Sequence, residues 1–241
     1  MMLGVALHAA VAYMQTPLGD MWGFQDVQTH VGFDVFVAFV HSFRMPVFFV
    51  MAGFFAALLY EQRGANRMVR NRVQRVLCPL VIGWMVLFPL TVGGFAFAQL
   101  GGDASALVAA IHLVASAGLL EHVQLIHLWF LYDLLLYYVA ALLICRLGRV
   151  VSHTAGRSLV DGFGRLLSRW YAPLVLAVPT ALTLVPMPSG MLETPGAFNR
   201  PLATVLAHGV FFAFGWLLYL RRELLHTLRL RAWGQIGRAH V

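Results

Sequence analysis

The stretch FDVFVAFVHSFRMPVFFVMAGFFAALLY, residues 33–60, followed by EQRGANRMVRNRVQR, residues 61–75, decides the fold of this protein. A transmembrane helix needs about 20 mostly apolar residues, and residues 33–60 are long enough to cross a bilayer with some tilt. The second stretch begins a block of arginines directly after the apolar segment. Arginine collects at the cytoplasmic ends of membrane spans, so this boundary predicts a transmembrane helix that ends inside.

The composition extends this interpretation to the whole chain. The 241 residues are 60% hydrophobic and 11% charged, whereas about 25% of the residues of soluble domains are charged. The sequence therefore predicts an all-α, polytopic integral membrane helix bundle in a lipid bilayer. Its six expected spans lie at residues 1–13, 33–60, 76–100, 127–147, 171–185 and 202–220. A weaker apolar stretch at residues 104–120 is expected to form an interfacial or re-entrant helix.

The basic charge follows the expected membrane topology. A net charge of +7 can indicate a nucleic-acid partner, but the arginines gather in blocks after every second apolar segment. This alternation is the positive-inside pattern, so we expect no nucleic-acid partner and a cytoplasmic amino end. The blocks are Arg63, Arg67, Arg70, Arg72 and Arg75; Arg146, Arg149, Arg157, Arg165 and Arg169; and Arg221, Arg222, Arg229 and Arg231.

Among the ionisable side chains inside expected spans, where charge is costly and often functional, three are candidates for a functional role. Arg44 is close to the midplane of the second span, and His41 lies three residues earlier on the same helical face. His8 lies at mid-membrane depth in LGVALHAAVAY. Arg44 can face a ligand or form a structural ion pair. His8 can act as a general base or form an interhelical contact.

Other candidate binding residues flank the spans. His127 opens the fourth span beside Trp129 on the expected outer side, where it can bind substrate or anchor the helix at the interface. The run RMVRNRVQR, residues 67–75, suits a phosphorylated donor, although ordinary positive-inside charge or contact with anionic lipid explains it better. The histidine spacing fits no compact zinc pattern, so no metal site is expected.

Four motifs in order resemble the multi-span membrane acyltransferase family 3, and in particular the branch that includes the glucans biosynthesis protein C succinyltransferases. The motifs are LGVALHAAVAY with His8; HSFRMPVFFVMAGFF, residues 41–55; RNRVQRVLCPL, residues 70–80; and HLWFLY, residues 127–132. Together with the helix pattern they cover nearly the whole chain.

The resemblance implies an enzyme of the bacterial inner membrane that takes an acyl group from a cytoplasmic acyl-coenzyme A. The acceptor is a carbohydrate hydroxyl, and in the glucan branch the acyl group is succinyl; no tightly bound cofactor is implied. By the same resemblance, His8 handles the acyl group or acts as base, with His41 and Arg44 beside it. Arg72 and Arg75 contact the donor, and His127 and Trp129 contact substrate.

The chain also departs from the family pattern. Ala52 stands where the family often has a serine, which excludes a hydroxyl role there. The family has about ten spans, so residues 1–235 are expected to be one partial acyltransferase domain that lacks both ends. The last residues, IGRAHV at 236–241, are expected to be a sequencing-adapter artefact. The alternative function is a non-catalytic transporter or a lipid- or glycan-binding membrane protein, whose buried His and Arg would line a substrate path.

Overall fold

The structure of the chain is a computed structural model that describes residues 2–16, 25–115, 124–125, 128–151, 153–187 and 198–225. These residues form helices and turns and no strand. The helices are α1 (Met2–Val11), α2 (Val31–Arg72), a π-helix (Val73–Leu77), α3 (Cys78–Gln99), α4 (Ala104–Ala115), α5 (Trp129–Val151), α6 (His153–Leu167), α7 (Ala172–Leu184), α8 (Leu202–Leu220) and a 3-10 turn (Arg222–Leu224).

The described helices confirm the expected all-helical membrane protein. Three helical stretches are long and apolar enough to cross a membrane: residues 31–99, 129–148 and 202–220. The apolar helices α1, α4 and α7 have 10, 12 and 13 residues, fewer than the roughly 20 that a span needs. The six spans therefore stay a prediction, although each expected segment is helical where the structure describes it.

The expected loop between the second and third spans is helical instead. Val31–Gln99 runs as 69 helical residues, interrupted by a bend at Gly64 with φ 74° and ψ 171°. Only glycine adopts such a conformation readily, because it has no Cβ. The turn therefore needs a single residue, and Arg67, Arg70 and Arg72 lie on a helix rather than in a loop.

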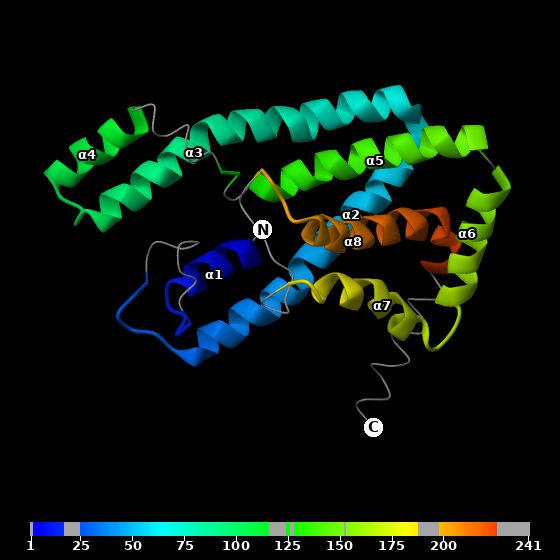
Figure 1. Cartoon of the computed structure of the whole chain (residues 1–241), viewed down its shortest axis with the longest axis horizontal. Coiled ribbons are helices and arrows are strands. Elements are labelled where there is room, and N and C mark those ends of the chain that lie inside the picture. Colours follow the sequence, from blue (N-terminus) through cyan, green and yellow to red (C-terminus); the bar gives the residue numbers. More distant parts are fainter. Residues whose placement is uncertain are drawn as a thin grey trace. The chain divides into compact units, whose positions relative to one another are not determined.

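The chain divides into two compact units, of which unit 1 comprises Met1–Pro46, Gln74–Tyr132 and Thr194–Arg200. In this unit α1 packs against the start of α2 through an apolar cluster of Leu7, Val11, Met14 and Val40. The Asp34 carboxylate accepts hydrogen bonds from the backbone N–H groups of Gln15 and Thr16, at 2.9 and 3.0 Å, and so ties the end of α1 to α2. The helices α3 and α4 form an antiparallel hairpin (Figure 1).

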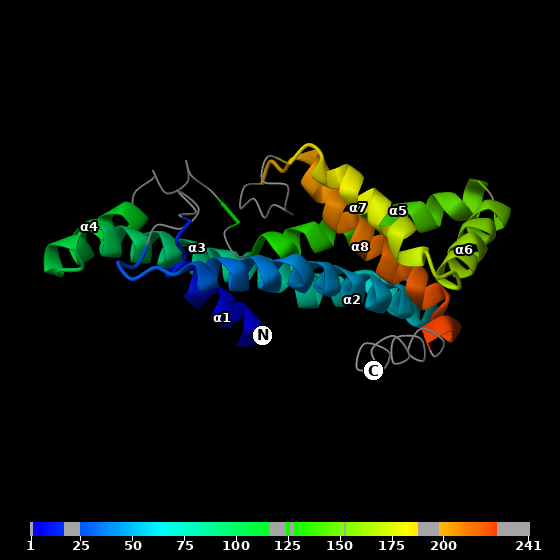
Figure 2. The same ribbon diagram turned by 90° about the horizontal axis from the view of Figure 1, so that it is seen from below.

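Unit 2 comprises Val47–Val73, Asp133–Glu193 and Pro201–Val241. Its helix α8 packs along α7 in both views (Figures 1 and 2). Glycines bring α8 onto α2: a Cβ at Gly53 would overlap the carbonyl oxygen of Phe212, and one at Gly215 would overlap that of Val50. Such close approach through small residues is typical of helix packing in membranes.

We predict that Gly215→Ala lowers the thermal stability of the purified protein in detergent, because the added methyl group must displace the α2 backbone. Overpacking of this kind costs about 1–3 kcal/mol. The matched control is Gly94→Ala, because nothing lies within 4 Å of a Cβ built at that residue of α3. Equal melting temperatures for the two variants would contradict the close α2–α8 contact.

Candidate functional site

The helices α1 and α2 bring a guanidinium close to the helix that carries His8. A Cβ built at Gly4 would lie 2.8 Å from Nη1 of Arg44, so the Arg44 side chain lies directly against α1. His8 follows Gly4 by four residues, which places both on one face of the helix. Arg44 and His8 are half-buried, and the Arg44 Nε is buried with no hydrogen-bond partner among the described residues.

His41 belongs to the same part of unit 1 and completes the predicted catalytic set. It is half-buried and precedes Arg44 by three residues on α2. An imidazole can accept a proton from a hydroxyl near neutral pH, and a guanidinium can stabilise a developing oxyanion. The pair of helices therefore carries imidazoles and a guanidinium, the kinds of group that can serve as a base and as an anion stabiliser in acyl transfer to a hydroxyl.

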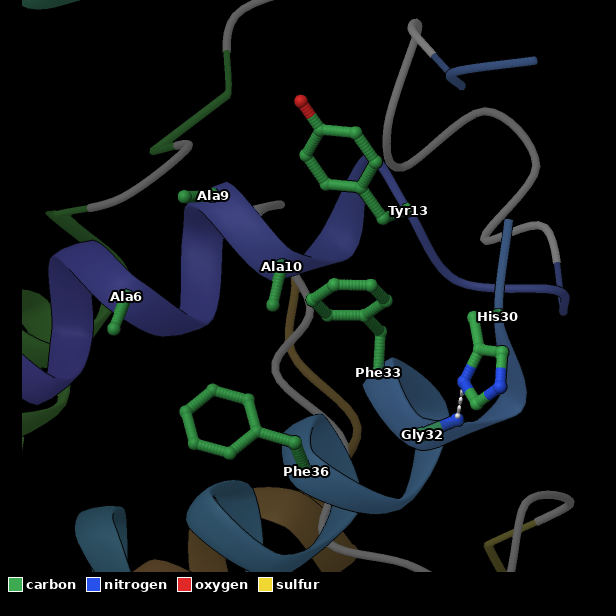
Figure 3. Close-up of a pocket in the computed structure, with 8 residues that line it drawn as sticks. All are labelled: Ala6, Ala9, Ala10, Tyr13, His30, Gly32, Phe33 and Phe36. Carbon is green, nitrogen blue, oxygen red and sulfur yellow. Dashed lines mark hydrogen bonds between the residues drawn. The ribbon is translucent and has the colours of Figure 1, made fainter. Parts of the chain in front are cut away.

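A pocket of about 480 Å³ lies between α1 and α2 on the side of Tyr13 and His30. Figure 3 shows Phe33 and Phe36 of α2 facing the alanines of α1. The lining residues are Ala6, Ala9, Ala10, Tyr13, His30, Gly32, Phe33 and Phe36. The His30 Nδ1 accepts a hydrogen bond from the Gly32 N–H at 3.0 Å. None of the predicted catalytic residues lines this pocket, whose apolar walls suit a hydrocarbon group.

Trp129, predicted to bind substrate, is the buried first residue of α5. The Arg200 guanidinium carbon lies 5.0 Å from the centre of its indole ring, a distance typical of a cation–π contact. No local sequence pattern pairs Arg200 with Trp129, because the two residues are 71 positions apart in the chain. His127, the other predicted outer residue, lies outside the described residues.

Arg72 and Arg75, the predicted donor contacts, have different surroundings. Arg72 is the half-buried last residue of α2, and its guanidinium carbon lies 4.6 Å from the centre of the Tyr138 ring. Tyr138 is the tenth residue of the apolar span 129–148. Arg72 thus lies beside the middle of this apolar helix, and its role as a donor contact stays a prediction. Arg75 is exposed and belongs to the π-helix, a rare helix type often found at functional sites.

Sequence reasoning missed a buried polar cluster in unit 2. Asp133 of α5 and His208 of α8 are fully buried, with Oδ2 and Nδ1 3.7 Å apart. Thr204, one turn before His208, is also fully buried, and its hydroxyl has no hydrogen-bond partner among the described residues. The Phe49 ring, 4.9 Å from the imidazole, covers the pair.

One signal could have found part of this cluster. Asp133 is a carboxylate inside the apolar run HLWFLYDLLLYY, and an intramembrane carboxylate indicates a functional or paired group. No sequence pattern could have found His208 as its partner, because the two residues meet only when α5 packs on α8. The Tyr137 hydroxyl supports that packing by donating a hydrogen bond to the carbonyl oxygen of Val205 at 2.7 Å.

Comparison with known proteins places the chain in a family. The family described as "Acyltransferase domain" matches residues 1–238, almost the entire chain. The chain belongs to this acyltransferase family. No solved structure matches it.

Similar curated proteins come from Escherichia coli. Glucans biosynthesis protein C of strain K12 is 31% identical over 81 residues, which are 34% of this chain and 20% of that protein. Its counterpart in strain O1:K1 / APEC matches with the same identity and coverage. The matched region thus spans about a fifth of the length of these relatives.

We predict that Gly4→Ala lowers acyl transfer about 10- to 100-fold while the protein stays folded. The new methyl group meets the end of the flexible Arg44 side chain, so the guanidinium moves and the helices do not. A displacement of about 1 Å near the reacting groups can lower a rate about a hundredfold. The control is Gly148→Ala, because nothing lies within 4 Å of that Cβ. Unchanged transfer in Gly4→Ala would show that the position of Arg44 against α1 is not required.

We predict a coupled effect on stability for the Asp133–His208 pair. Removal of one member of a buried polar pair leaves the other without its partner, whereas replacement of both by apolar residues is often neutral. Asp133→Leu and His208→Leu should each lower the melting temperature, and the double variant should recover most of the loss. If the double variant instead loses as much melting temperature as the two single variants together, the two side chains do not compensate each other.

Proposed function

We propose that the protein is a membrane-bound O-acyltransferase that moves an acyl group from an acyl-coenzyme A donor to a hydroxyl of an envelope glucan or another carbohydrate. The observation that carries the proposal is the Arg44 guanidinium against α1, one turn from His8. The family match over residues 1–238 supports the same chemistry. Succinyl is the first acyl group to test, because the sequence motifs resemble the glucan succinyltransferase branch.

In the proposed reaction, His8 takes the proton from the acceptor hydroxyl as its oxygen attacks the thioester carbonyl. A carbon–oxygen bond forms, and Arg44 stabilises the negative charge on the carbonyl oxygen. The carbon–sulfur bond then breaks, and the leaving thiolate takes the proton back from His8. The products are an ester and a free thiol, so no further co-reactant is needed. His41, on the same face of α2 as Arg44, orients the reacting groups.

The remaining predicted residues bind the two substrates in this proposal. Arg72 and Arg75 hold the phosphates of the donor, which enters from the cytoplasmic face. Trp129 and His127 contact the carbohydrate on the opposite face. The arginine blocks support a bacterial inner-membrane protein with its amino end in the cytoplasm, because arginine accumulates on that side.

One observation favours a second candidate function, a non-catalytic lipid-binding or transport protein. The pocket between α1 and α2 has walls of alanine and phenylalanine and holds about 480 Å³. Such a pocket suits an acyl chain, which a lipid-binding protein would retain and not transfer. The two candidates differ in whether a labelled acyl group becomes covalently attached to carbohydrate.

We predict that His8→Ala in the full-length protein lowers transfer of radiolabelled succinyl from succinyl-coenzyme A to membrane glucan by about 100-fold or more, the usual effect of losing a general base. His112→Ala is the matched control, because His112 is exposed on α4 and has no proposed role. Equal transfer by the wild type and His8→Ala would exclude His8 as the base. A wild-type protein that transfers no acyl group would favour the lipid-binding candidate.

A further inference from the structure

The contact between Arg72 and Tyr138 has a geometry that the proposed donor contact alone does not explain. The guanidinium carbon lies 4.6 Å from the centre of the phenol ring. The ring is 4% exposed, and the Phe212 ring lies 5.7 Å from it in an edge-to-face arrangement. Tyr138 is therefore a fixed aromatic surface on which the long side chain of Arg72 rests.

Two helices independently place this contact near the middle of a membrane span. Tyr138 is the tenth residue of the 20-residue span on α5, about 14 Å along the helix from Trp129. Phe212, its neighbour, is the eleventh residue of the 19-residue helix α8. The hydrocarbon core of a bilayer is about 30 Å thick, so a bilayer centred on these two helices would have the guanidinium close to its middle.

A cation at that depth needs compensation, and the ring supplies only part of it. A cation–π contact covers one face of the planar guanidinium and leaves its N–H groups pointing outward in the plane. The Arg72 Nε is buried with no hydrogen-bond partner among the described residues. The π-helix Val73–Leu77 begins at the next residue. The stacked side chain is thus ready to meet an anionic group with its edge.

We propose that Tyr138 is a positioning residue that holds the Arg72 guanidinium flat at mid-span, where the guanidinium edge binds an anionic group of the acyl donor. The proposal rests on the proposed function and adds the depth at which the donor's phosphate or carboxylate is held. An intramembrane arginine marks a substrate path more often than a surface arginine does. The donor therefore enters the helix bundle and is not bound only at the surface.

The test compares four full-length variants by the KM of the acyl donor. Tyr138→Phe keeps the aromatic face and should keep the donor KM. Tyr138→Leu and Arg72→Gln should each raise the donor KM roughly tenfold, while the KM of the carbohydrate acceptor stays unchanged. The double variant should match Arg72→Gln alone, because Tyr138 acts only through Arg72. An unchanged donor KM in Tyr138→Leu, or a further rise in the double variant, would overturn the proposal.

Arg72→Lys provides a second test that leaves the buried core around Tyr138 intact. Lysine keeps the charge and loses the planar fork, so the donor KM should rise toward that of Arg72→Gln. A normal donor KM in Arg72→Lys would show that the flat stack is not required. This variant decides the question even where Tyr138→Leu does not fold.

Direct binding separates this proposal from the proposed function and from a lipid ligand. Coenzyme A binding is measured on the full-length protein in nanodiscs of phosphatidylcholine, with and without phosphatidylglycerol. We expect Arg72→Gln and Tyr138→Leu to weaken coenzyme A binding in both lipids, even where acyl transfer is absent. Unchanged coenzyme A affinity together with reduced retention of phosphatidylglycerol would assign the site to a lipid headgroup and overturn the donor assignment.

Discussion

A guanidinium inside a hydrocarbon layer has to be covered or paired, and this constraint governs Arg44 and Arg72. Arg44 lies against the backbone of α1, where Gly4 leaves room for it. Arg72 lies on the ring of Tyr138 near the middle of α5. In both cases the Nε is buried without a hydrogen-bond partner among the described residues. Both arginines are therefore suited to bind an anion that arrives with a substrate.

A membrane offers few polar partners to a helix, and this also determines how the helices of unit 2 pack. Apolar side chains pack against lipid as well as against each other, so helices associate through close backbone approach and polar contacts. Gly53 and Gly215 allow α2 and α8 to touch, and the Asp133 carboxyl and the His208 imidazole lie 3.7 Å apart between α5 and α8. Tyr138 packs among the same helices, with the Phe212 ring 5.7 Å from its own ring and the Arg72 guanidinium on its face.

The family match and the geometry contribute different information. The match over residues 1–238 concerns the chain as a whole, whereas the E. coli relatives cover only 34% of it at 31% identity. The geometry adds which groups meet: Arg44 with α1 near His8, and Arg200 with Trp129. The identities of the acyl donor and of the acceptor are therefore proposals, and substitutions at these contacts can test them.

Local features of the chain could be predicted from residue order. Runs of apolar residues predicted helices, and α8 coincides with residues 202–220 because a span is a local property of consecutive side chains. Arg44 was recognisable as a buried charge for the same reason. The contacts of Arg72 with Tyr138 and of Asp133 with His208 join residues 66 and 75 positions apart, and no local period encodes them. They exist because α2, α5 and α8 pack together, and that packing sets the depth of Arg72 and the partner of Asp133.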